Sequence, residues 1–343
     1  MRLGQVSSDD ISIDRGLPQG APESPLILTM IMDMVIRSLE PQWRDKGYAF
    51  SLDQFRLTAV CYADDIVLAA SSKEHLEEMI RDVVRELDKI GLGVGADKTH
   101  WTSTPPSEGE LLRVDAEEVT WEETLTFVGT VIDLRGSAGP AIQYRMAQAN
   151  KAYAKWRGIL TCPWLPKAQR IKLLPKIVFL VLLWSSSTWT MTKEQQQKIA
   201  SWSARMASKV ARLRRPPHQE IDQWWRLLHK YGHRILSRHS IDVVKMCRTR
   251  MFSWAGHLAR MDPDAPAACA LRCRGMQWWR WRQQCHKHSK DKWNGPHPQI
   301  FKIFRWEEQI SQTFGEGFSE DVRLSTGWLL TAQDREAWRR AII

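Results

Sequence analysis

Two short apolar segments with an acidic pair between them place the tightest limit on how this 343-residue chain folds. Residues 57–62 and 66–69 are rich in β-forming side chains, and only Ala63-Asp64-Asp65 separates them. The pattern predicts a β-hairpin with Asp64 and Asp65 at its tip. Adjacent carboxylates at such a tip either form an ordinary acidic turn or hold a hard cation such as Mg²⁺ through oxygen ligands.

An amphipathic helix is predicted directly after this hairpin. Apolar residues at positions 76, 79, 80, 83, 84, 87 and 90 recur at helical spacing and form one stripe. Ser71 followed by Glu74 is typical of a capping box, and Gly91 suits the helix end. These signals predict a helix with one apolar face.

A second helix is predicted upstream, and a strand downstream. The upstream helix is expected to begin with Ser24 as its N-cap and to run to about Ser38, with the methionines at 30, 32 and 34 filling the core. Residues 126–133 indicate a strand broken by Gly129. The front of the chain therefore combines short strands with helices.

Charge divides the chain into an acidic front and a basic back. Residues 1–150 contain 14 Lys and Arg against 25 Asp and Glu, whereas residues 151–343 contain 35 against 14 and hold 15 of the 18 tryptophans. Helical periodicity punctuated by prolines predicts a mostly helical back, so the fold class is α+β. The basic excess indicates a polyanionic partner, most often nucleic acid, over the alternative of a solvated basic surface.

Membrane insertion, secretion and a zinc centre are all disfavoured. The longest apolar run, residues 177–184, is far too short to span a bilayer, and the N-terminus has no apolar signal core. The six cysteines do not form a secreted disulfide framework. A spacing that resembles a zinc site occurs at Cys269, Cys273, Cys285, His286 and His288. Because its first pair is C-x3-C and not the commoner C-x2-C, reduced thiols are favoured over zinc.

A stiff loop precedes the upstream helix. Residues 15–25 contain two glycines and three prolines, which let the backbone approach a ligand closely in front of a helix N-terminus. Gln19 is a candidate contact to a base or to a template backbone. By itself the segment predicts no more than a rigid loop before a capped helix.

Taken in order, these segments resemble the reverse transcriptases of LINE-type (non-LTR) retrotransposons. The family's QG-x-P-x-SP segment matches Gln19, Gly20, Pro22, Ser24 and Pro25, and its YADD hairpin matches Tyr62, Ala63, Asp64 and Asp65. Its GL and KT residues match positions 91–94, Lys98 and Thr99, although Gly95 stands where the family usually has Asn. The likeness continues at Phe127-Val128-Gly129 and, more weakly, at residues 254–261 and 332–338.

The resemblance implies a fold and a reaction. Residues 1–142 would be a partial polymerase palm, an antiparallel sheet with packed helices; residues 143–217 a helical thumb; and residues 218–343 a basic, Trp-rich helical region. The implied activity is RNA-directed DNA synthesis by two-metal phosphoryl transfer. The implied partners are an RNA template, a DNA primer and deoxynucleoside triphosphates, and no membrane partner is expected. Nuclear residence is expected.

The resemblance also implies roles for particular residues. Asp64 and Asp65 would bind Mg²⁺, and Lys98 would neutralise or protonate the leaving pyrophosphate. The nucleotide and template pocket would comprise Arg15, Gln19, Gly20, Pro22, Ser24 and Tyr62, and the primer grip would comprise Phe127, Val128 and Gly129.

One difference from the family pattern leads us to expect no activity from this chain alone. The family's first metal-binding Asp lies on a strand well upstream of the QG segment, and only fourteen residues precede Arg15. We therefore expect a truncated copy or a partial gene model that is inactive alone. The alternatives are a non-catalytic nucleic-acid-binding remnant, using basic and Trp-rich stretches such as residues 272–282, and an unrelated α+β protein.

Overall fold

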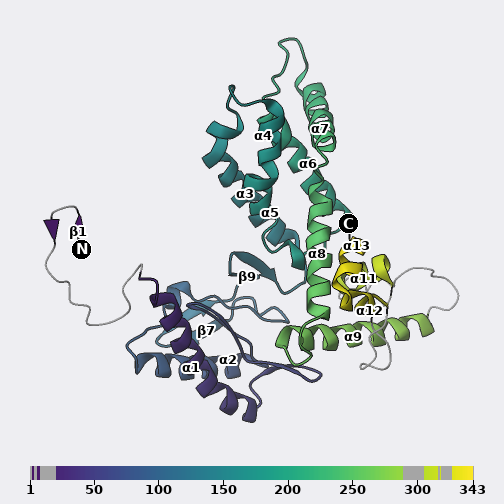
Figure 1. Ribbon diagram of the computed structural model, residues 1–343. Coiled ribbons are helices and arrows are strands. Elements are labelled where there is room, and N and C mark those ends of the chain that lie inside the picture. The colour runs from purple at the N-terminus through teal and green to yellow at the C-terminus, as the bar shows by residue number, and fades with distance from the viewer. Residues whose placement is uncertain are drawn as a thin grey trace. The chain divides into compact units, whose positions relative to one another are not determined.

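The computed structural model describes residues 2–3, 6–7, 21–288, 305–315, 317 and 327–342 (Figure 1). Short antiparallel strand pairs and many helices confirm the predicted α+β class. The chain divides into two compact units, Met1–Val128 and Gly129–Ile343. The finer division at residues 142 and 217 stays a prediction. None of the helices in the described ranges is both long and apolar enough to cross a membrane.

The first unit combines strand pairs with two long helices. Its described pairs, β1–β2, β3–β4, β5–β6 and β7–β8, are all antiparallel. In chain order its elements are β1 (Arg2–Leu3), β2 (Val6–Ser7), α1 (Ser24–Asp45), β3 (Phe50–Leu52), β4 (Phe55–Leu57), β5 (Ala59–Tyr62), β6 (Asp65–Leu68), α2 (Lys73–Asp88), the 3₁₀ turn η1 (Ala96–Lys98), β7 (Leu111–Val114), β8 (Glu117–Thr120) and β9 (Thr124–Phe127).

Helices α1 and α2 pack against each other and form the core of this unit (Figure 1). The core side chains follow helical spacing on both helices: Met32, Ile36, Leu39 and Trp43 on α1, and Met79, Val83 and Leu87 on α2. The prediction for the three methionines is wrong for two of them. Met30 and Met34 are exposed, because positions 30 and 34 lie on the face of α1 opposite to Met32.

The helix ends differ from the predicted ones by small shifts with local causes. Helix α1 begins at Ser24, so its N-cap is Glu23 and not the predicted Ser24. The helix continues past the predicted end at Ser38, through Pro41, to Asp45. Helix α2 is capped by Ser72, whose hydroxyl accepts from the backbone N–H of His75 at 3.2 Å. The predicted cap, Ser71, bonds the His75 ring instead at 2.8 Å. Because adjacent serines are equally good N-caps, the sequence alone does not decide between Ser71 and Ser72.

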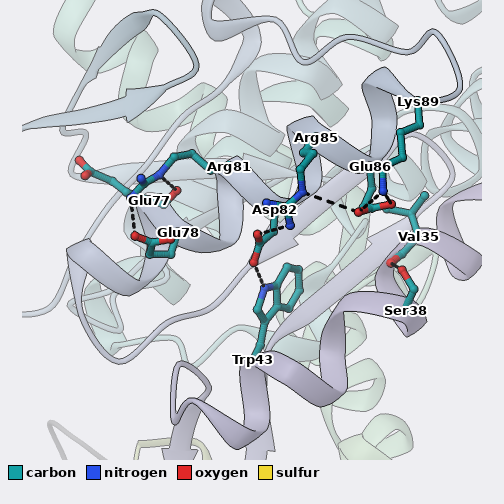
Figure 2. Close-up of polar contacts among 10 residues, drawn as sticks. All are labelled: Val35, Ser38, Trp43, Glu77, Glu78, Arg81, Asp82, Arg85, Glu86 and Lys89. Carbon is teal, nitrogen blue, oxygen red and sulfur yellow. Dashed lines mark hydrogen bonds and ion pairs between the residues drawn. The ribbon is translucent and has the colours of Figure 1, made fainter.

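A buried polar contact joins the two helices (Figure 2). The Trp43 indole N–H of α1 donates to the Asp82 carboxylate of α2 at 3.0 Å. Arg85, one turn further along α2, donates to the other oxygen of Asp82 at 2.6 Å. Trp43 and Asp82 are both buried, so the carboxylate enters the core only because both of its oxygens have donors.

The second unit is almost entirely helical in its described part. Apart from β10 (Thr130–Asp133), its elements are α3 (Gly139–Leu160), α4 (Lys167–Leu174), the π-helical turn η2 (Pro175–Phe179), α5 (Leu180–Leu182), the 3₁₀ turn η3 (Ser186–Thr188), α6 (Lys193–Val210), α7 (Ile221–Arg238), α8 (Val243–Ala259), α9 (Pro266–His288), α11 (Arg305–Phe314), α12 (Gly327–Gln333) and α13 (Arg335–Ile342). The prolines at 163, 166, 216 and 217 separate helices as predicted. Pro175 does not end its helix, since the chain widens into the π-turn there.

Two hydrophobic clusters stabilise this unit. The larger one is built from α3 to α8 and includes Ile142, Leu174, Phe179 and Ile199, all of them buried. The smaller one joins α8, α9, α11, α12 and α13 around Trp278, Trp328 and Trp338. Helix α7 approaches α6 so closely that a side chain at Gly232 would overlap the Ala204 carbonyl oxygen.

The α6–α7 contact includes a histidine pair that predicts acid sensitivity. His233 Nε2 lies 3.2 Å from His229 Nε2, which lies 3.0 Å from the Ser201 hydroxyl. Burial, and then the proximity of His229, lower the pKa of His233, against a smaller opposing effect of Asp242. A histidine that binds its proton more weakly when folded contributes stability that is present above the unfolded pKa of about 6.5 and is lost as the pH falls below it.

We therefore expect the urea concentration at which half of the chain is unfolded to decrease when the pH is lowered from 7.5 to 5.5. Carboxylates also make the urea midpoint depend on pH. The test therefore compares the wild type with His233→Gln, whose urea midpoint should decrease less over the same pH range. Equal falls in the two proteins would contradict this assignment.

Candidate metal-binding hairpin and basic helical surface

The predicted hairpin is present. Strands β5 and β6 pair antiparallel, with Ala59 opposite Leu68 and Tyr62 opposite Asp65. This register leaves Ala63 and Asp64 as the two turn residues, so the hairpin has the shortest common loop. The predicted hairpin with the acidic pair at its tip is confirmed over residues 59–68, but Leu57 belongs to β4, where it pairs with Phe50 of β3.

The turn presents both carboxylates to solvent. Asp64 lies in the turn and Asp65 begins β6, and both side chains are exposed. Ala63 has a φ of 54°, in the left-handed region that costs a non-glycine residue about 1 kcal/mol. The surrounding strands must hold the turn in this conformation. Two neighbouring carboxylates at one exposed tip supply the oxygen ligands that a hard divalent ion such as Mg²⁺ takes, with water completing its coordination.

The hairpin is anchored to α1 by packing and by one polar link. Ala59, Ile66 and Leu68 pack against the α1–α2 core. The buried hydroxyl of Thr58, just before β5, donates to the Glu40 carboxylate of α1 at 2.8 Å. Burial raises the pKa of Glu40, but the hydrogen bonds from Thr58 and Arg44 outweigh it, so the net pKa lies below its ordinary value. The position of the acidic tip is therefore set by the core of the first unit.

Several apolar side chains around the hairpin have no cover in the described part of the chain. On β5, Val60 is 42% exposed and Tyr62 is 62% exposed. On α1, which contacts β5, Leu26, Met30 and Met34 are 58–70% exposed. Exposed large apolar groups on two adjoining elements are typical of a surface that another polypeptide segment or a ligand covers.

Lys98 lies on a segment that the same core holds. Gly91, with a φ of 76°, ends α2, and Leu92 and Val94 pack against the α1–α2 core. The chain then forms η1, at whose last position the Lys98 side chain is exposed. The predicted role of Lys98 toward a leaving group stays a prediction.

The remaining predicted pocket residues are only partly described. Pro22 lies just before α1, Ser24 is its first residue, and Tyr62 is exposed at the end of β5. Arg15, Gln19 and Gly20 lie outside the described residues, so their predicted place beside the acidic tip stays a prediction.

The predicted primer-grip segment is a turn and not one continuous strand. Phe127 ends β9, and Thr130 begins β10. Val128 and Gly129 between them both have positive φ, at 47° and 68°, which is the signature of a type I′ turn. The predicted break at Gly129 is thus part of a two-residue reversal.

The candidate zinc ligands do not form an assembled site in the described part of the chain. Cys269 and Cys273 lie one turn apart on α9. The side chains of Cys285, His286 and His288 lie outside the described part. Within the described part, no group of three or more His, Cys, Asp or Glu residues could hold a metal ion.

The aromatic and basic stretch at residues 272–282 is largely structural. Trp278 is fully buried and donates to the Glu308 carboxylate at 2.9 Å. Arg274 forms an ion pair with the buried Glu307 at 2.5 Å. Burial raises the pKa of Glu307, and Arg274 offsets only part of that rise. Trp278 and Arg274 thus join α9 to α11, and Trp278 is a core residue. The Arg274 side chain is 45% exposed, so the nucleic-acid role of this stretch stays a prediction.

A different basic surface, which the sequence analysis did not single out, extends over residues 151–215. Fourteen Lys and Arg occur there against one acidic residue, Glu194. Within the described part of the chain, none of the fourteen forms an ion pair. Trp164, in the loop between α3 and α4, is 91% exposed. A charge count in windows shorter than half the chain would have shown this segment.

Comparison with known proteins agrees with the geometry of the first unit. Residues 3–132 match the family described as reverse transcriptase (RNA-dependent DNA polymerase). Over 96 residues the chain is 32% identical to the Pol polyprotein from a type-1 retrotransposable element R2 of Nasonia vitripennis. Over 93 residues it is 32% identical to that from the type-2 element R2DM of Drosophila melanogaster.

These matches differ in how much of each protein they cover. They span 28% and 27% of this chain but only 9% and 8% of the two polyproteins. A putative uncharacterized transposon-derived protein of Caenorhabditis elegans is 23% identical over 298 residues, which are 83% of this chain and 95% of that protein. The longer match thus extends the similarity into the helical unit.

Proposed function

We propose that the chain is part of an RNA-directed DNA polymerase of the non-LTR retrotransposon kind, because residues 3–132 match the reverse transcriptase family and short stretches are similar to the Pol polyproteins of R2 elements. In the intact enzyme it would contribute the metal-binding hairpin and a helical nucleic-acid-binding region. The partners would be an RNA template, a DNA primer and deoxynucleoside triphosphates, and the place of action would be the nucleus.

The observation that carries this proposal is the exposed carboxylate pair at the tip of the β5–β6 hairpin. Polymerases of this family depend on a divalent metal ion. Asp64 and Asp65 would hold Mg²⁺, which would stabilise the charge that develops on the attacking and leaving oxygens during phosphoryl transfer. The α1–α2 core anchors the hairpin that carries this pair.

Other residues would act on the substrates around that tip. Lys98 would neutralise the leaving pyrophosphate, and Tyr62 would contact the nucleotide from the exposed end of β5. Pro22 and Ser24, at the start of α1, would shape the pocket together with Arg15, Gln19 and Gly20. The Phe127-Val128-Gly129 turn would hold the primer end.

We further propose that the chain alone does not extend a primer. Two-metal transfer needs carboxylates on both ions, and in the described part Asp64 and Asp65 have no third acidic partner. The exposed apolar side chains of α1 and β5 support the proposal that another polypeptide segment packs on this face. The second candidate function, nucleic-acid binding without chemistry, is favoured by the unpaired positive charge of residues 151–215.

The proposed metal site can be tested with Fe²⁺ as the probe. Fe²⁺ with ascorbate cleaves a backbone close to the bound ion, so the full chain should be cut near residues 62–66, and excess Mg²⁺ should compete. Asp64→Asn/Asp65→Asn should abolish this cut. The hairpin β7–β8 supplies the matched control: Asp115 and Glu117 are also exposed at a tight turn, and Asp115→Asn/Glu117→Gln should leave the cut unchanged.

Cleavage elsewhere, or cleavage that survives in Asp64→Asn/Asp65→Asn, would exclude the hairpin as the metal site. Primer extension on an RNA template tests the inactivity separately. Wild type and Asp64→Asn should give the same absence of product, and Asp64-dependent synthesis by the wild type would show that the chain is catalytically complete.

A further inference from the structure

One end of the helical unit gathers exposed basic and aromatic side chains. The C-terminal turn of α3, the 161–166 loop, the first turn of α4 and the C-terminal turn of α6 all lie there (Figure 1). The buried Arg170 of α4 donates to the backbone carbonyl of Val210, the last residue of α6, at 2.7 Å. Lys209 of α6 lies 5.6 Å from the ring centroid of Tyr153 on α3. We call this end of the unit the helical tip.

Trp164 is the most exposed large apolar residue of the described chain, at 91%. Its loop is short and stiff, because Pro163 and Pro166 flank it and the Leu165 N–H donates to the Cys162 carbonyl at 3.3 Å. An indole held out by a rigid loop keeps both faces open to water. Such exposure is unfavourable for the protein alone and suits a ligand with a flat aromatic face.

The charges around Trp164 specify the chemistry of that ligand. Arg157, Lys167 and Lys209 are exposed on the three helices that meet at the helical tip. Arg212, Arg214 and Arg215 follow α6 directly and are exposed as well. None of the six has an acidic partner in the described part. The ligand is therefore polyanionic as well as aromatic.

Helix dipoles account for only part of this charge. Cations near the last turns of α3 and α6 complement the negative helix ends, which explains Arg157 and Lys209. Lys167 is the first residue of α4, where a cation is unfavourable. The charge at the helical tip thus exceeds what the helices themselves require.

We propose that the helical tip binds single-stranded nucleic acid, with a base stacked on Trp164 and phosphates neutralised by the surrounding lysines and arginines. Unstacked bases expose the flat faces on which an indole ring can stack, whereas the bases of a duplex are already stacked on one another. This proposal rests on the second candidate function, nucleic-acid binding without chemistry, and deepens it by naming the residues and the single-stranded ligand. It needs neither a metal ion nor a nucleotide.

The test is fluorescence anisotropy of labelled oligo(U) and oligo(dT) with the full chain, in EDTA, at 50–200 mM salt. Trp164→Ala should weaken binding by about five- to a hundred-fold, the effect of one stacked base, while Trp164→Phe should retain most of the affinity. Trp184→Ala is the matched control, because Trp184 is 50% exposed at the opposite end of the unit, near Gly129. The two oligonucleotides show whether the sugar matters.

The charged part of the site is tested by the salt dependence. Lys167→Gln/Arg214→Gln/Arg215→Gln should reduce the log–log salt slope by about 2, since each phosphate contact on a single strand contributes roughly 0.7. Wild-type affinity in Trp164→Ala, at an unchanged melting temperature, would overturn the proposal, and so would an equal loss in Trp184→Ala. Because the assay contains EDTA, failure of the metal-site test would leave this result standing.

Discussion

Replacing Gly256 by alanine is expected to destabilise the C-terminal part of the helical unit by about 3 kcal/mol, at the upper end for overpacked cores. Gly256 is buried in α8, and the Trp338 ring of α13 lies against its backbone. A methyl group there would overlap the indole. The ring cannot retreat easily, because its N–H donates to the Phe252 carbonyl at 2.9 Å and the ring itself is buried.

The control is the same substitution in another helix. Gly158 of α3 is exposed, and a side chain added there would meet no atom within 4 Å. Gly158→Ala should therefore stabilise the chain by roughly 0.5–1 kcal/mol, the ordinary helix preference for alanine. Urea unfolding followed by circular dichroism measures both variants. A Gly256→Ala protein as stable as Gly158→Ala would show that α13 does not pack on α8 in this way.

This packing joins the two distant C-terminal segments that the sequence analysis compared with one family. Residues 254–259 end α8, and Arg260 and Met261 follow it directly. Residues 332–338 span the end of α12 and the start of α13. The Arg260 guanidinium donates to the Ala332 carbonyl at 2.6 Å, and the Gln333 amide donates to the Ala259 carbonyl at 2.8 Å. The two segments are halves of one packed structure, so a likeness of both to LINE tails would follow from a shared core and would not require a shared ligand.

The features that were predictable from the sequence are those that local chemistry decides. The β5–β6 hairpin follows from two apolar runs around a two-residue turn, and α2 follows from its stripe of apolar residues. Helical geometry places Met30 and Met34 opposite to Met32, but which of these two faces is covered depends on the neighbours of α1 and was not predictable. The burial of Trp278 depends equally on α11, which is distant in the sequence.

The contact between Trp43 and Asp82 provides the second large effect (Figure 2). Trp43→Phe removes the indole N–H and leaves a buried carboxylate with one donor fewer. Removing one partner of a buried charged contact costs about 3 kcal/mol or more. Asp82→Leu removes the charge but leaves the indole N–H unpaired, at a cost of about 1–3 kcal/mol.

The double variant distinguishes this interpretation from simple loss of packing. In Trp43→Phe/Asp82→Leu both polar partners are gone, so the unfolding free energy should recover to within about 1 kcal/mol of the wild type. Arg85→Gln is the control. Because the Arg85 side chain is 58% exposed, water or the glutamine amide can replace its hydrogen bond to Asp82, and the loss should be less than about 1 kcal/mol. If the losses in the two single variants simply add in the double variant, the indole and the carboxylate do not stabilise each other. The α1–α2 core would then position the acidic hairpin by apolar packing alone.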